Sequence, residues 1–175
     1  MLILLLACRP DDVSDSGTPY VPEEADADTD ADTDTDTDAD ADADADMSIA
    51  ADWLSTGSDL SPLFAGSGIT RIDASFKSDG SYSVGAVYAG TTYDFTGTYT
   101  VDASTDPGAI TLSQVEPYAT TAEGLWSISG DTLTYEVVDL SNTDGHTAPT
   151  LSGGFGSTTG PGLSDGDNIQ TYQRQ

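Results

Sequence analysis

Short runs in which apolar and polar residues alternate constrain the fold of this chain most strongly. Ile72, Ala74 and Phe76 alternate with polar residues, and Ser78-Asp79-Gly80 follows, where Asp-Gly favours a tight hairpin turn. Alternation with a period of two places the apolar side chains on one face of a β-strand. Similar runs occur at 82–88, 93–101, 110–112, 125–128, 133–137 and 169–172. About seven or eight strands in such an arrangement predict an all-β domain, a single antiparallel barrel or a flattened sandwich.

Two stretches of this domain depart from the pattern. Residues 51–64 are expected to include one short helical turn, and residues 139–167 are rich in Gly, Ser, Thr and Pro. A connection of that length without regular structure is uncommon, and it is typically either mobile or functional. No segment after residue 49 has a sustained helical periodicity, so the interpretation stays all-β.

From Asp26 to Asp46 every second residue is aspartate, with Ala or Thr between. This alternation provides no apolar face, and aspartate is a poor strand former. Repulsion among the carboxylates favours an extended, disordered segment. We therefore expect an acidic tether over residues 8–48 and a folded β-domain over residues 49–175. Weak, diffuse association of divalent cations with the aspartates is an alternative role, whereas an EF-hand calcium loop would also need its Gly and its bidentate Glu.

Residues 1–7 are apolar and end in Ala7, directly before Cys8, the single cysteine of the chain. Leu5-Leu6-Ala7-Cys8 resembles the lipobox of bacterial lipoproteins. The resemblance implies that residues 1–7 are a signal peptide and that Cys8 carries a diacylglycerol and further acyl chains such as palmitate. These lipids would anchor the protein in a membrane.

The residues on either side of the lipobox extend this interpretation. No Lys or Arg precedes the apolar run, so we expect a truncated signal peptide and a start codon upstream of Met1. Arg9 rather than Asp follows the cysteine. By analogy with enteric bacteria, this predicts the outer membrane or the cell surface.

Three segments in the middle of the β-domain carry a second resemblance, namely Gly97–Asp102, Asp106–Leu112 and Gly124–Leu133. They resemble a lipocalin-like domain found in many uncharacterised bacterial proteins. Lipocalins also carry Gly-x-Trp at the start of the barrel and an Arg near the last strand that packs on the Trp. Here Ala51-Asp52-Trp53 and Arg174 take these places. The resemblance implies a lipocalin-like barrel, closed by Trp53 and Arg174, with a capacity to hold a small apolar ligand.

Seven aromatic residues of the predicted strands would line such a ligand site. They are Tyr82, Tyr88, Tyr93, Phe95, Tyr99, Trp126 and Tyr135. The commoner role of such rings is to fill the core of a small barrel. The same residues therefore support two hypotheses, which the filling of the barrel interior distinguishes.

The sequence predicts no catalytic site, no cofactor and no metal centre in the β-domain. His146 is the single histidine, and a His/Cys cluster typical of zinc sites is missing from the sequence. Gly153-Gly154-Phe155-Gly156 is not followed by the Lys of a phosphate-binding loop. With 31 acidic and four basic residues, the chain has a net charge of −27. This excludes nucleic acid as a natural partner, because phosphate binding requires Lys and Arg.

Together these features predict a non-enzymatic cell-envelope lipoprotein that displays a small β-barrel interaction module on a long acidic tether. The alternative is a lipocalin-type carrier of a small apolar ligand. A filled barrel interior would favour the interaction module, whereas an open one lined by the aromatic residues would favour the carrier.

Overall fold

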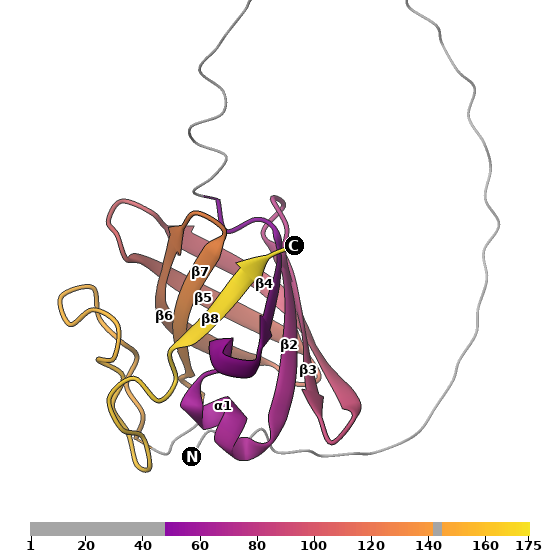
Figure 1. Ribbon diagram of the computed structural model, residues 1–175. Helices are drawn as coiled ribbons and strands as arrows, with labels where there is room; N and C mark the ends of the chain where they lie inside the picture. Colours follow the sequence, from indigo (N-terminus) through magenta and orange to yellow (C-terminus); the bar gives the residue numbers. More distant parts are fainter. Residues whose placement is uncertain (1–47, 142–144) are drawn as a thin grey trace, which may run out of the picture. The chain divides into compact units, whose positions relative to one another are not determined.

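A closed barrel of eight antiparallel strands, arranged in sequence order, forms the folded part of the chain (Figure 1). The computed structural model describes residues 48–141 and 145–175. The strands are β1 (Asp52–Thr56), β2 (Ile69–Phe76), β3 (Ser81–Tyr88), β4 (Thr91–Asp102), β5 (Gly108–Glu116), β6 (Thr120–Ser129), β7 (Thr132–Asp139) and β8 (Gln170–Arg174). The predicted all-β antiparallel barrel is confirmed.

The connection between β1 and β2 contains two short helical segments, the 3-10 helix η2 (Gly57–Asp59) and the helix α1 (Pro62–Ser67). Ser61 caps α1 by accepting a hydrogen bond from the amide of Phe64, and Pro62 suits the first helical position. The helical turn expected within residues 51–64 therefore covers only the second half of that stretch. Its first half is strand β1, which alternation does not mark because only two of its side chains, Trp53 and Ser55, are buried and one is polar.

Strand registers divide the connections between two ends of the barrel. The hairpins β2–β3, β4–β5 and β6–β7 lie at the end where Trp53 pairs with Arg174, which we call the tryptophan end. Helix α1, the turns β3–β4 and β5–β6 and the long connection from β7 to β8 lie at the opposite end. We call this the helix end; it is at the bottom of Figure 1.

Close contact between neighbouring strands requires glycine at Gly124 of β6. A Cβ atom there would lie 1.9 Å from the carbonyl oxygen of Glu136 and 2.7 Å from the Cα of Val137. Both positions are on the paired strand β7, so neither neighbour is a side-chain tip that turns away easily. Gly124 therefore lets β7 approach β6 more closely than any other residue would allow.

The long connection from β7 to β8 lies on the β6 side of the barrel (Figure 1), and its residues Gly156 and Thr158 contact Glu136 of β7. Leu125 and Val138 are buried there, although neither belongs to the cluster of buried residues inside the barrel. Glu136 is fully buried beside them and accepts hydrogen bonds from the amide of Gly156 (2.6 Å), the amide of Thr158 (3.2 Å) and the hydroxyl of Thr158 (2.5 Å). The expected loop is thus present, and a buried carboxylate attaches it to the barrel.

Candidate functional site

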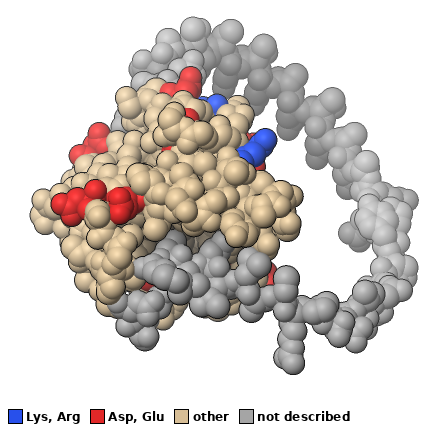
Figure 2. All heavy atoms as spheres, turned by 60° about the horizontal axis from the view of Figure 1, so that its bottom comes forward, with Lys and Arg blue, Asp and Glu red and all other residues tan. Residues whose placement is uncertain are grey.

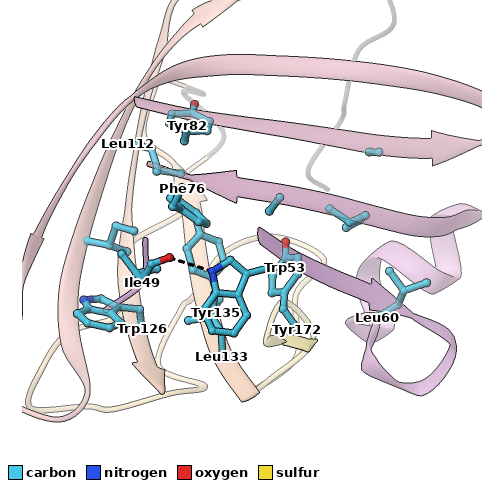
Figure 3. Close-up of a cluster of buried hydrophobic side chains, with 14 of the residues drawn as sticks. Ile49, Trp53, Leu60, Phe76, Tyr82, Leu112, Trp126, Leu133, Tyr135 and Tyr172 are labelled. Carbon is cyan, nitrogen blue, oxygen red and sulfur yellow. Dashed lines mark hydrogen bonds between the residues drawn. The ribbon is translucent and has the colours of Figure 1, made fainter. Parts of the chain in front are cut away.

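The tryptophan end of the barrel is closed by contacts between its first and last strands. Trp53 is 1% exposed, and its indole nitrogen donates to the carbonyl oxygen of Ile49 at 2.9 Å (Figure 3). The guanidinium carbon of Arg174 lies 4.7 Å from the centroid of the indole ring. Trp53 and Arg174 are also register partners between β1 and β8. The structure thus places in contact the two residues that the sequence resemblance predicted to close the barrel.

Aromatic rings from several strands meet in the barrel interior next to this closure. The ring of Phe76 on β2 lies 5.1 Å from that of Tyr99 on β4 and 6.3 Å from that of Tyr135 on β7. Neither of these strands is a neighbour of β2 in the barrel. Tyr82 and Tyr172 extend the set, at 6.1 Å from Phe76 and Tyr135 respectively. This part of the interior is therefore filled from wall to wall by rings in tilted and edge-to-face contact.

Three phenols of this aromatic layer are buried without hydrogen bonds. Tyr82, Tyr135 and Tyr172 are 5%, 8% and 5% exposed. Within residues 48–141 and 145–175, none of their hydroxyls forms a hydrogen bond. Every side-chain nitrogen or oxygen atom in these residues that is fully buried does have a hydrogen-bond partner. The hydroxyl oxygens therefore keep surface that a water molecule can reach. We call these three residues the interior phenols.

Burial raises the pKa of each interior phenol. It raises the pKa of Tyr82 to about 12 and that of Tyr172 further. It also raises the pKa of Tyr135, to which the nearby Tyr172 and Tyr82 contribute by electrostatic repulsion of the ionised form. The three groups are thus neutral hydrogen-bond donors at physiological pH, and their hydroxyls are close enough to affect one another.

Toward the helix end the interior wall changes in character. Ala122 of β6, Val84 of β3, Phe95 of β4 and Val137 of β7 pack against the core but are only partly buried. Gly124 of β6 provides no side chain at this level. The strands β3, β4, β6 and β7 therefore present an apolar inner surface that the barrel does not fully cover.

The opposite side of the helix end is sealed. Leu60 is buried in the core, and Phe64 of α1 packs against it. Gln170 of β8 is 1% exposed; its amide oxygen accepts from the backbone of Ser61 at 2.8 Å, and its amide nitrogen donates to the hydroxyl of Ser55. These contacts hold the β1–β2 connection against β8.

The seven aromatic residues predicted to line a ligand site fall into two groups. Tyr82, Trp126 and Tyr135 belong to the buried core cluster, and Phe95 and Tyr99 pack against it. Tyr88 and Tyr93 lie outside that cluster, at the helix end of β3 and β4, where Tyr88 is 43% exposed beside Gly68. Trp126 and Tyr99 are partnered, because they donate to the carbonyl oxygens of Ala109 and Lys77.

Tyr172 and Phe76 belong to the aromatic layer but were not among the predicted ligand-site residues, although both lie in predicted strands. Tyr172 stands two positions before Arg174 and two after Gln170, and all three are on the same side of β8 by alternation. The signal for Tyr172 was this spacing in β8. The burial of Glu136 had none, because its partners Gly156 and Thr158 are about 20 residues distant and belong to a loop.

Charged residues are distributed over the outside of the barrel. Figure 2, in which the helix end comes forward, shows acidic residues in separate patches with few basic ones on a largely uncharged surface. Within the described part of the chain, the basic residues are Arg71, Lys77 and Arg174. No cluster of three or more metal-ligating side chains occurs among the described residues, and no helix there is long and apolar enough to cross a membrane.

Cys8, the predicted lipidation site, and the aspartate run of the predicted tether lie outside the described residues. Comparison with known proteins adds no relative: no family model, no curated protein and no solved structure matches this chain.

Proposed function

We propose that this protein is a lipid-anchored envelope protein whose lipocalin-like barrel carries a small, largely apolar ligand. The observation that carries the proposal is that part of the apolar inner surface is not fully covered. Val84, Phe95, Ala122 and Val137 pack against the buried core but stay partly exposed. A concave apolar surface with few polar groups is typical of sites for small molecules.

The closing contacts of the barrel give the ligand a direction of entry. Trp53 and Arg174 close the tryptophan end, and Gln170 fixes the β1–β2 connection across one side of the helix end. A ligand would therefore enter between α1 and the turns β3–β4 and β5–β6 and would rest on the aromatic layer. In this proposal the protein binds its ligand without chemical change and is not an enzyme.

Adjacent residues of β6 provide a test of the interior site. Ala122 faces the core and is partly buried, whereas Thr121 is exposed. We expect the full chain carrying Cys8→Ser to bind the fluorescent probe N-phenyl-1-naphthylamine. Ala122→Trp should weaken this binding at least about tenfold by occupying the site, and Thr121→Trp should leave it unchanged. Absence of probe binding, or equal effects of both substitutions, would contradict the carrier function.

The lipid anchor on Cys8 is a separate part of the proposal, and the resemblance of Leu5-Leu6-Ala7-Cys8 to a lipobox supports it. Two or more acyl chains would hold the protein stably, since each buried CH₂ contributes about 0.8 kcal/mol. We expect the protein to sediment with membranes and to partition into detergent, and Cys8→Ser to release it. An unmodified Cys8 thiol in membrane-derived protein, measured by mass spectrometry, would refute the anchor.

Exposed apolar side chains at the helix end favour a second candidate, the interaction module. Val115, Tyr118 and Leu140 are 62%, 44% and 39% exposed at the ends of β5, β6 and β7. Their exposure is compatible with contact to another envelope protein. If the probe fails to bind but a Tyr118→Ser variant loses an envelope partner that the parent chain retains in crosslinking, this candidate replaces the carrier.

A further inference from the structure

We propose that the hydroxyls of Tyr82, Tyr135 and Tyr172 recognise a neutral oxygen acceptor, such as a carbonyl group, on the ligand of the barrel. This inference rests on the proposed carrier function and specifies the class of ligand. The preferred molecule would be apolar over most of its length and would carry one uncharged acceptor at the end that reaches the aromatic layer.

The geometry of the aromatic layer places these donors together. Tyr135 of β7 and Tyr172 of β8 are on neighbouring strands, and their rings meet edge to face at 6.1 Å. Tyr82 approaches from β3 on the other side, because Phe76 contacts both Tyr82 at 6.1 Å and Tyr135 at 6.3 Å. Figure 3 shows the three tyrosines among the buried side chains of the cluster. The rings of the three tyrosines therefore reach the interior from both sides of the barrel.

These hydroxyls are unlike the other polar groups of the core. The indole of Trp53 has a backbone partner, the amide of Gln170 has three partners, and the phenol of Tyr99 donates to Lys77. The interior phenols make no hydrogen bond within the described residues, and their hydroxyl oxygens keep some accessible surface although the residues are buried. A ligand oxygen that reaches these hydroxyls would replace the hydrogen bond that water can make there.

The charges around the site favour a neutral ligand over an anionic one. Of the basic residues in the described part of the chain, Arg174 lies over Trp53, Arg71 pairs with Asp73 on the surface, and Lys77 is exposed in the β2–β3 turn. Arg174 is also 3.7 Å from Asp131, and each phenol has a raised pKa that keeps it uncharged. The phenols themselves therefore offer a buried carboxylate no positive charge, which makes its burial beside them unfavourable.

A pair of matched ligands tests the inference. Using the full chain with Cys8→Ser, we would displace N-phenyl-1-naphthylamine with 2-acetylnaphthalene and with 2-ethylnaphthalene, which differ by one carbonyl oxygen. We expect the ketone to bind about 3- to 10-fold more tightly than the hydrocarbon, the range of one neutral hydrogen bond. The anion 2-naphthoate should bind more weakly than either.

Removal of single hydroxyls then identifies the donors. Tyr135→Phe and Tyr172→Phe should each reduce the preference for the ketone toward unity and leave the affinity for 2-ethylnaphthalene unchanged. Tyr118→Phe, the same change at a 44% exposed residue, is the control and should preserve the preference. A circular dichroism melt of each variant verifies that it folds.

The outcomes separate this inference from the carrier function. If the probe and both naphthalenes bind but the preference is missing, or persists in Tyr135→Phe and Tyr172→Phe, the phenols do not select the ligand and the carrier function stands. If 2-naphthoate binds most tightly, the neutral-acceptor class is wrong. If neither the probe nor the naphthalenes bind the parent chain, both proposals are refuted.

Discussion

Replacement of Arg174 by alanine should destabilise the barrel more than replacement of any other described basic residue. Arg174 covers the indole of Trp53, with 4.7 Å between the guanidinium carbon and the ring centroid. Its side chain is 23% exposed, so the contact is partly desolvated. The variant loses this contact at the seam where β8 meets β1, which is made of two register pairs only, Trp53 with Arg174 and Leu54 with Gln173.

The magnitude follows from the separate contacts of Arg174. A cation over an aromatic face contributes about 0.5 kcal/mol when exposed and about 2 kcal/mol when desolvated. The ion pair with Asp131 adds little, because its atoms are 3.7 Å apart and the aspartate side chain is 86% exposed. The aliphatic stem covers further apolar surface. We therefore expect Arg174→Ala to lower the free energy of unfolding by about 1–2 kcal/mol.

Urea unfolding of the Cys8→Ser chain, followed by tryptophan fluorescence and circular dichroism, measures this effect. Arg71→Ala is the matched control: Arg71 forms a shorter ion pair, 2.5 Å from Asp73, but its side chain is 52% exposed. The control should cost less than about 0.5 kcal/mol. Arg174→Lys should recover only part of the loss, because the ammonium group lacks a planar face.

Three results would refute this account of the closure. Equal losses in Arg71→Ala and Arg174→Ala would show that the loss of any arginine has the same effect. Full recovery in Arg174→Lys would show that charge alone matters. If Asp131→Asn lowered the free energy of unfolding as much as Arg174→Ala, the ion pair with Asp131 rather than the contact with the indole would explain the stability.

Three further predictions concern the strands, the loop and the interior phenols. Gly124→Ala should destabilise the barrel by more than about 2 kcal/mol in urea unfolding, because its Cβ meets the backbone of β7, and Ala122→Gly on the same strand should cost less. Glu136→Gln should cost about 1–3 kcal/mol and speed hydrogen exchange at the amides of Gly156 and Thr158, whereas an equal exchange rate in both proteins would contradict the anchoring role. Above pH 10 the urea midpoint should fall. The pKa of each phenol is raised in the folded chain, so the tyrosines of the unfolded chain lose their protons at a lower pH and the unfolded state is stabilised. A midpoint that is constant from pH 9 to pH 11.5 would contradict this.

The strands of the β-domain could be predicted from the sequence because the pattern that specifies them is local. Alternation at Ile72, Ala74 and Phe76 marks the buried face of β2, and turn residues mark the ends of strands without any knowledge of partners. Strand β1 was not predicted because one of its two buried side chains, Ser55, is polar. Its hydrogen-bond partner Gln170 is distant in sequence and meets it only in the folded barrel. The lipobox and the aspartate run lie outside the described residues, so they stay predictions.

The sequence by itself determined where strands β2 to β8 form, and that Trp53 and Arg174 stand at the two ends of the domain where a closed barrel joins its edges. Only the tertiary structure decided how the interior is filled. Whether an inward aromatic ring fills the core or faces open space depends on strands far apart in sequence, as the contact of Phe76 with Tyr135 illustrates. Tyr82 and Tyr88 have the same type and parity on one strand, yet one is buried without a partner and the other is at the rim. The period of a strand specifies the face of a side chain, whereas its depth in the barrel follows from register and closure.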